Sequence, residues 1–111
     1  MDLKEEQAEA GTVLRVKGRL DSTTAPVLGE RLTAMLGAAK DRVLVDFSEL
    51  EYISSAGFRV LLLAAKRADV HDSRFAICGV QGKVRQLFDL GGFLDLFTIG
   101  STRDEGIAAL K

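Results

Sequence analysis

The sequence contains few of the side chains on which most enzymes and metal sites depend. Its 111 residues include one histidine, one cysteine, one proline and no tryptophan. His71 stands alone in the turn-like segment 70–73, so a metal ion there would lack further ligands. Cys78 lies in an apolar run and is predicted to be a packing residue. We therefore predict a protein that is not an enzyme and holds no metal.

Signals for nucleotides, nucleic acids and membranes are equally scarce. Neither GxGxxG nor GxxxxGK[ST] occurs, so no phosphate-binding loop and no cofactor are predicted. The net charge of -1 offers no general basic field for nucleic acid or an anionic membrane. The longest apolar stretch, Val60 to Ala65, is far shorter than the roughly 20 residues that span a bilayer. Because the first ten residues also lack the apolar core of a signal peptide, we expect a cytoplasmic protein.

Length and composition favour one domain over residues 1–111. The chain is somewhat shorter than a typical domain of about 150 residues. Its apolar share of 47% is enough to fill a core of that size. Since no extended apolar patch emerges from the periodicity, we expect a monomer that recognises its partners locally.

Apolar periodicity predicts helices alternating with short strands after an initial hairpin that turns near Ala10 and Gly11. The expected segments are a hairpin over 3–20, helices over 22–37, 54–70, 84–90 and 102–110, and strands over 42–47, 74–79 and 97–99. Hydroxyl side chains at 22–24 are expected to cap the first helix, and residues 48–53 are expected to form a loop. This order indicates an α/β fold whose sheet is largely parallel after the hairpin.

Two serines stand where the expected loop meets the second helix, in the segment YISSAGFR over residues 52–59. One hydroxyl can cap free backbone amides of the first turn. A phosphate at the same point would meet those unpaired N–H donors and the positive end of the helix dipole. The residues by themselves leave both interpretations open, a simple cap and a phosphorylation switch.

A helical projection separates a sheet-facing side of the second helix from an outer stripe. The sheet-facing side contains Gly57, Leu61, Ala64, Ala65 and Ala68. The outer stripe contains Ser55, Arg59, Leu62 and Lys66. An exposed leucine framed by two cations and a serine is typical of a small recognition surface with an apolar anchor and a polar rim. The alternative is that Leu62 packs under a neighbouring element.

Three segments resemble the STAS domain of bacterial anti-sigma factor antagonists: GRLDSTTAP at 18–26, VLVDFSELEYISSAGFRVLL at 43–62 and GKVRQLFDLGGF at 82–93. The resemblance covers nearly the whole chain. It implies a mixed sheet of four to five strands, with the hairpin first and parallel strands after it, and about four helices packed mainly on one face.

The resemblance also implies partner switching. The unphosphorylated antagonist binds an anti-sigma factor, usually a serine kinase with a GHKL-type ATP-binding fold, and thereby releases the sigma factor. Phosphorylation by the kinase breaks the complex, and a PP2C-type phosphatase restores it.

Site residues follow from the family pattern Asp-Ser-Ser-Gly, which aligns with residues 54–57. The resemblance puts the phosphate acceptor at Ser55. Ser54 replaces the acid, which leaves Ser54 as the alternative acceptor. Asp21 matches a position near the acceptor, with helix capping as its other interpretation, and Asp46 matches a structural strand-end position. The partner-binding surface implied in this way consists of Asp21, Ser54, Ser55, Arg59, Leu62 and Lys66.

Two other functions compete with this interpretation. The same fold can serve as a constitutive scaffold, or as a subunit of another signalling or lipid-transport complex. A two-component receiver domain would need an acidic pair after the first strand, an acceptor Asp and a Lys after the last strand. Segments 20–22 and 45–47 supply only isolated acids, and no Lys directly follows residues 97–99.

Overall fold

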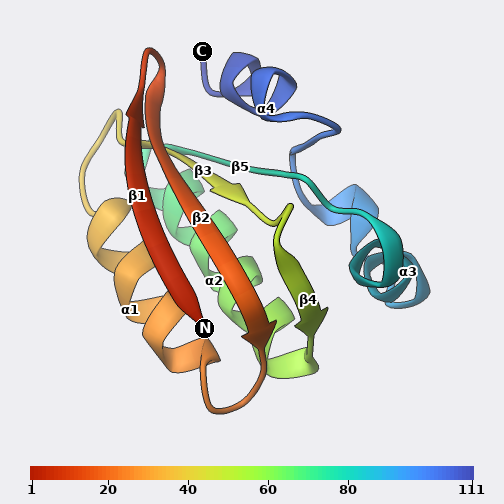
Figure 1. Cartoon of the computed structure of the whole chain (residues 1–111). Helices are drawn as coiled ribbons and strands as arrows, with labels where there is room; N and C mark the ends of the chain where they lie inside the picture. Colours follow the sequence, from red (N-terminus) through yellow and green to blue (C-terminus); the bar gives the residue numbers. More distant parts are fainter.

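The computed structural model describes all 111 residues and has the alternating order expected (Figure 1). The strands are β1 (Asp2–Ala8), β2 (Gly11–Leu20), β3 (Arg42–Asp46), β4 (Leu50–Ile53), β5 (Arg74–Cys78) and β6 (Ile99–Gly100). The helices are α1 (Ala25–Met35), α2 (Ser55–His71), α3 (Gly82–Leu90) and α4 (Arg103–Ala109), and a 3-10 turn, η1 (Leu94–Leu96), follows α3. None of these helices has the combined length and apolar character that crossing a membrane demands.

The strands form one mixed sheet in which only the hairpin is antiparallel. Its order is β1-β2-β3-β5-β6, and β4 pairs with β2 beside this path. The β1–β2 pair is antiparallel, whereas all the other pairs are parallel. The predicted α/β class, hairpin and parallel arrangement are confirmed. The sheet has six strands rather than four to five, because β4 adds to the five strands expected from the sequence.

The expected loop over 48–53 is wrong, because residues 50–53 form β4. Strand β2 is long enough to pair twice along the same side, with β3 through residues 12–15 and with β4 through residues 18–20. The register shifts between Gly18 and Arg19, and Gly18 has a φ of 103°, which a side chain would disfavour. This bend lets β4 continue the sheet beyond the end of β3 and brings the start of α2 beside the end of β2.

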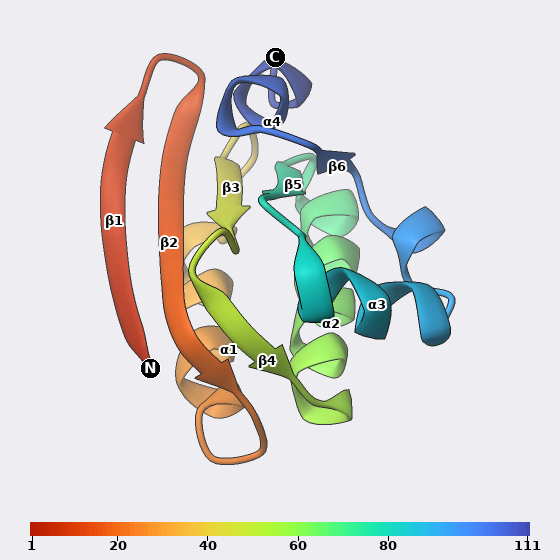
Figure 2. The same ribbon diagram turned by 45° about the vertical axis from the view of Figure 1, so that its right-hand side comes forward.

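The two faces of the sheet carry different helices. Leu14 and Val45 belong to the main core under α1 and α2, whereas Val13, Leu44 and Cys78 form a smaller core on the other face. Leu110, just after α4, completes that smaller core. Figure 2 shows α4 above β3, β5 and β6, with α1 and α2 behind the sheet and α3 beyond its edge. The helices therefore pack mainly on one face, as predicted, with α4 as the exception.

Helix α2 presents its small residues to the sheet. Gly57, Leu61, Ala64 and Ala68 are buried as projected, and Ala65 is half-buried. A Cβ on Gly57 would lie 2.8 Å from side-chain atoms of both Leu20 and Ile53. The glycine thus permits the close approach of the first turn of α2 to β2 and β4.

The last strand and the end of α2 differ from the sequence prediction. The last strand covers 99–100 instead of 97–99, because residues 94–96 form η1 and delay its start. Helix α2 continues to His71, so this histidine ends a helix rather than lying in a turn. Asp72 then stops the helix in the left-handed conformation, with a φ of 54°.

Candidate functional site

Two parallel strands bring the predicted site residues together from distant parts of the chain. Leu20 and Ile53 are register partners at the carboxyl ends of β2 and β4. The Ser54 amide donates a hydrogen bond to the Leu20 carbonyl at 2.9 Å. Asp21 and Ser54 therefore leave the sheet side by side, at the point where α2 begins.

The two serines of this segment differ sharply in exposure. Ser54 is the N-cap residue of α2, with extended backbone, but its side chain makes no capping bond. Its Oγ is buried and has no hydrogen-bond partner. Ser55 is the first residue of α2 and is exposed to solvent. The predicted hydroxyl cap is thus absent, and only the Ser55 hydroxyl is accessible to an enzyme acting from outside.

The first turn of α2 offers free donors to an anion. The Phe58 amide donates to the Ser54 carbonyl at 3.1 Å, and the amides before Phe58 precede the helical bonding pattern. Arg59 lies one turn beyond Ser55, is exposed and forms no ion pair. A phosphate on Ser55 would therefore be stabilised by backbone donors, by the helix dipole and by a nearby cation.

Asp21 organises the loop that precedes α1. Its Oδ1 accepts hydrogen bonds from the amides of Thr23 at 3.0 Å and Thr24 at 3.2 Å. The Thr24 hydroxyl accepts from the Asp21 amide at 2.9 Å and donates to the Arg19 carbonyl at 2.8 Å. The backbone bonds from Thr24 and Thr23 lower the pKa of Asp21. The hydroxyls of 22–24 do not cap α1 as predicted, because Thr24 is occupied within this loop.

An aromatic residue and a cation at this end of the sheet were not predicted from the sequence. The guanidinium carbon of Arg19 lies 4.4 Å from the centroid of the Tyr52 ring. These residues are register partners in the β2–β4 pair. Periodicity alone does not reveal such a pair, because it requires knowing that β4 is a strand and with which residues it pairs.

The predicted outer stripe of α2 is exposed along its whole length. Ser55, Arg59, Leu62 and Lys66 all face solvent, and Leu62 is 37% exposed. Leu62 is not the only exposed leucine of α2, since Leu63 is 56% exposed. Leu63 lies on the flank of α2 that faces α1, which belongs to neither the sheet-facing side nor the outer stripe of the helical projection.

Comparison with known proteins identifies the family. The family model described as "Mlab, STAS domain" matches residues 3–98. The chain belongs to the STAS domain family. The protein named "Putative anti-sigma factor antagonist BtrV", from Bordetella bronchiseptica, is 32% identical over 111 residues, which cover 100% of this chain and 96% of that protein.

Solved structures support the same fold. A crystal structure of an anti-sigma factor antagonist from Mycobacterium paratuberculosis superposes with a TM-score of 0.86 at 22% identity, covering 98% of this chain and 92% of that one. SpoIIAA in its unphosphorylated form superposes with a TM-score of 0.76 at 20% identity, covering 96% and 93%. The phosphorylated form of this Bacillus cell-fate determinant superposes with a TM-score of 0.71 at 18% identity, covering 99% of this chain and 100% of that one.

Aromatic packing ties the site of this STAS domain to α3. Phe58 stacks on Phe93, with ring centroids 4.1 Å apart, and meets Phe88 edge-on at 4.8 Å. Phe88 in turn contacts Phe97 at 6.1 Å between centroids. Aromatic side chains of α3 and of the segment after it therefore support the first turn of α2.

Asp46 of the STAS domain is structural, as expected. It is 6% exposed, and its carboxylate accepts from the Ser48 amide at 2.9 Å and from Arg103 Nη2 at 3.0 Å. Burial acts to raise its pKa, but the bonds from Ser48 and Arg103 outweigh burial, so the pKa is lowered. Burial, reinforced by the charge of Asp46, raises the pKa of the neighbouring Cys78 thiol to about 12.

Proposed function

We propose that this protein is a partner-switching anti-sigma factor antagonist of the cytoplasm. As an unphosphorylated monomer it binds an anti-sigma factor that is also a GHKL-type serine kinase, and the bound sigma factor is released. Phosphorylation of Ser55 breaks this complex, and a PP2C-type phosphatase restores the binding form. The chain is a substrate and a binding module in this cycle and catalyses no reaction.

The contrast between Ser54 and Ser55 carries the proposal. The Ser54 hydroxyl is buried at the N-cap, whereas the Ser55 hydroxyl is exposed one residue further on. A kinase must reach the oxygen that it modifies, so accessibility favours Ser55. SpoIIAA, which shares the fold, is known in unphosphorylated and phosphorylated forms.

The mechanism of release rests on charge beside an apolar contact. In the proposed complex the partner covers Leu62 and surrounds it with groups that face Ser55, Arg59 and Lys66. A phosphate adds a charge of about -1.5 to -2 at Ser55. This charged group loses its hydration when the partner docks, which costs free energy. Phosphorylation therefore weakens the complex. In the free protein, by contrast, the phosphate is stabilised by the uncapped first turn of α2.

Mass spectrometry of the protein purified from its native host tests the proposal. We expect a phosphopeptide carrying the modification on Ser55, and we expect its loss in the Ser55→Ala variant. Phosphate found on Ser54 instead would assign the acceptor role to Ser54. Lack of phosphate in every growth condition, together with an unchanged set of co-purifying partners, would instead support the constitutive scaffold.

Replacement of Leu62 tests the docking surface. Leu62→Glu is expected to weaken kinase binding at least tenfold while the melting temperature stays close to that of the wild type, because the side chain is already 37% exposed. Binding is measured by titration calorimetry and stability by thermal unfolding. A fall in melting temperature that accounts for the lost binding would mean that Leu62 belongs to the core.

A further inference from the structure

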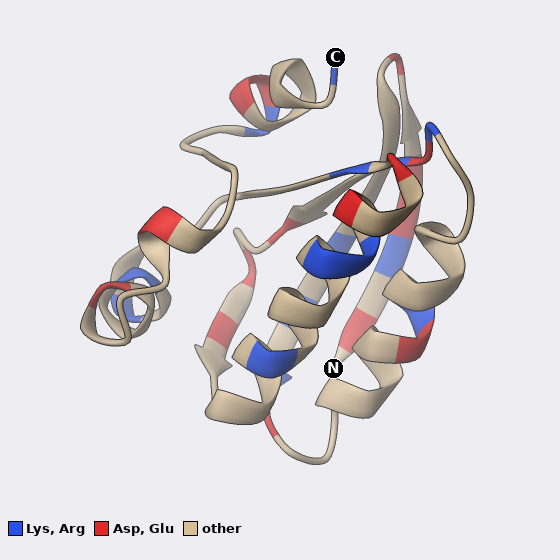
Figure 3. Ribbon diagram, turned by 180° about the vertical axis from the view of Figure 1, so that it is seen from behind, with Lys and Arg blue, Asp and Glu red and all other residues tan.

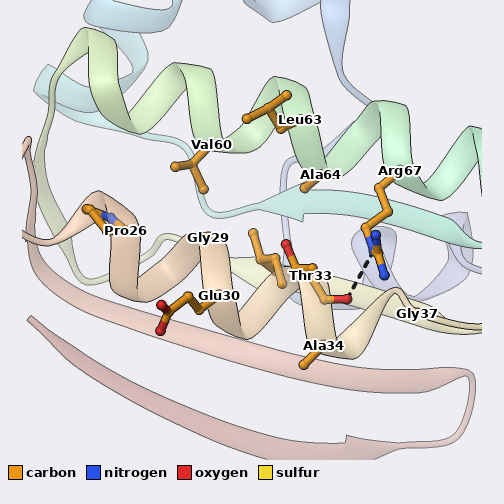
Figure 4. Close-up of a pocket in the computed structure, with 11 residues that line it drawn as sticks. Pro26, Gly29, Glu30, Thr33, Ala34, Gly37, Val60, Leu63, Ala64 and Arg67 are labelled. Atoms are coloured by element: carbon orange, nitrogen blue, oxygen red, sulfur yellow. Dashed lines mark hydrogen bonds between the residues drawn. The ribbon is translucent and has the colours of Figure 1, made fainter.

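A groove of about 650 Å³ separates the outer sides of α1 and α2. It is lined from α1 by Pro26, Gly29 and Thr33, and from α2 by Val60, Leu63 and Arg67. Figure 4 shows Val60 reaching toward α1 while Arg67 extends across to Thr33. The groove lies on the flank of α2 that the outer stripe leaves out.

Small residues make the groove deep. Gly29 has no side chain to fill it, and a Cβ there would still lie 3.5 Å from a Val60 methyl group. Ala64 and Ala34 add only methyl groups to the lining. The hollow is therefore ready to receive apolar side chains of another molecule.

The apolar surface extends beyond the groove, which argues for a protein occupant. Leu62 and Val70 on α2 and Val27 on α1 remain exposed outside it. A small ligand confined to the groove would leave these side chains exposed to water. A helix laid along α1 and α2 would cover both the groove and its surroundings.

Three cations of α2 on this side of the molecule form no ion pair. Arg59, Lys66 and Arg67 form none of the five ion pairs of the protein, which all involve Arg15, Arg31 or Arg103. Figure 3, which looks onto α1 and α2, shows the resulting blue bands along α2. Arg67 uses Nε to donate to the Thr33 carbonyl at 3.0 Å, which leaves its two other nitrogens for a partner.

Acidic residues of the two helices do not neutralise these cations. The Glu30 carboxylate is turned away from Arg67 in Figure 4. Asp69 lines a separate small hollow against η1. A complementary partner would therefore present carboxylates to α2.

We infer that the α1–α2 groove is a second docking site for the kinase partner, and that it takes an amphipathic helix with acidic residues beside its apolar stripe. Leu63 and the groove receive the apolar side chains, and Lys66 and Arg67, at the far end of the helix from Ser55, pair with the carboxylates. This inference rests on the function proposed above.

The position of the groove gives it a role distinct from that of Ser55. Leu63 lies eight residues beyond Ser55, roughly 12 Å along α2, and Arg67 lies roughly 18 Å beyond it. Contacts at this distance persist while the kinase engages the hydroxyl, and they respond little to the phosphate. The groove would therefore hold the substrate, whereas Ser55 decides release.

Steady-state phosphorylation by the purified host kinase that modifies Ser55 tests the inference. Leu63→Glu and Lys66→Glu are each expected to raise KM at least tenfold with kcat within about twofold of the wild type. Arg67→Glu is expected to do the same and Arg67→Lys to retain most of the binding, and the effect of Arg67→Glu should shrink at high salt. Leu90→Glu and Arg85→Glu on α3, both exposed, are the matched controls and should leave KM unchanged.

Hydrogen exchange on the same complex gives an independent readout. Amides of 26–37 and 60–67 are expected to be slowed when the kinase binds. Normal KM values for the groove variants, with wild-type protein phosphorylated on Ser55, would overturn the inference and leave the proposed function intact. Failure of every host kinase to phosphorylate the wild type would overturn both. A small apolar molecule retained in the groove, with normal KM values, would assign it to a ligand instead.

Discussion

Ser54 and Thr102 occupy the same position before two helices, yet only Thr102 makes a capping bond. The Thr102 Oγ1 accepts from the Glu105 amide at 3.2 Å, and the Glu105 carboxylate accepts from the Ser101 amide at 3.1 Å. The Ser54 Oγ is buried without any partner. A buried hydroxyl without a partner costs free energy, whereas a capping bond stabilises the protein by about 1 kcal/mol.

Alanine substitution at the two N-cap positions should have opposite effects. Ser54→Ala is expected to leave the free energy of unfolding unchanged or to raise it by up to about 1 kcal/mol, because it removes an unsatisfied polar group. Thr102→Ala is expected to lower it by about 1 kcal/mol. Urea titrations of both variants provide the comparison, and a clear loss of stability in Ser54→Ala would show that its hydroxyl does have a partner in solution.

Ser55→Ala should be nearly silent for folding. The side chain is exposed and lies inside the helix rather than at its N-cap, and alanine has the higher helix propensity. The melting temperature is expected to stay within about 2 °C of the wild type, while the protein remains locked in its kinase-binding form. Calorimetry and a kinase-binding assay are compared on the same preparation. Ser55→Asp should bind more weakly, but less so than the phosphorylated protein, since a carboxylate carries less charge than a phosphate.

Two glycines show how helix packing is set at the level of elements. Gly57 faces the fully buried side chains of Leu20 and Ile53, which cannot move aside. Gly29 faces the open groove, where a methyl group would meet Val60 at an ordinary distance. A glycine-to-alanine substitution therefore creates a steric clash in α2 but has room for the new methyl group in α1.

Gly57→Ala and Gly29→Ala are predicted to change stability in opposite directions. Overpacking at Gly57 is expected to lower the free energy of unfolding by about 1–3 kcal/mol, despite the better helix propensity of alanine. Gly29→Ala is expected to raise it by about 0.5–1 kcal/mol. Denaturant midpoints measure both, and equal effects of the two substitutions would contradict the packing described here.

Elements that can be read from local sequence were predicted well. The long apolar face of α2 and the hairpin turn near Ala10 follow from periods of 3.6 and 2 within single segments. Strand β4 was missed because four residues carry too little periodicity, and its identity depends on pairing with β2 beyond the bend at Gly18. The stacking of Arg19 on Tyr52 was missed for the same reason, since both follow from that pairing.

At the scale of the whole molecule, a chain of ion pairs links the two ends of the sequence. Arg103 at the start of α4 donates to Glu6 of β1 at 2.6 Å and to Asp46 at the end of β3 at 3.0 Å. Arg15 of β2 pairs with Glu6 and with Glu49. No local pattern predicts this network, because its members lie up to 97 residues apart.

Acid should weaken this link. The hydrogen bond from Arg103 lowers the pKa of Glu6 from its ordinary value of 4.5. Burial tends to raise the pKa of Asp46, but its hydrogen bonds lower it from 3.8. Groups with depressed pKa values stabilise the fold above their unfolded values, and the contribution is lost as pH falls through the folded values. Stability should therefore fall progressively below about pH 4.

Arg103→Gln should remove much of that pH dependence. The difference in free energy of unfolding between wild type and variant is expected to be largest above about pH 5 and to shrink below pH 4. Arg31→Gln is the control, because it breaks an exposed pair with Glu5 that does not involve α4. Parallel stability curves for wild type and Arg103→Gln would show that the network does not act as described.

The buried thiol of Cys78 has a practical consequence. It is 1% exposed and, with a pKa of about 12, holds almost no thiolate at neutral pH. Thiol reagents should therefore not react with it while the protein is folded. A cysteine placed at position 62 or 63 could then carry a single fluorophore without replacement of Cys78. The slow rate at which Cys78 itself is labelled would then report the rate of global unfolding.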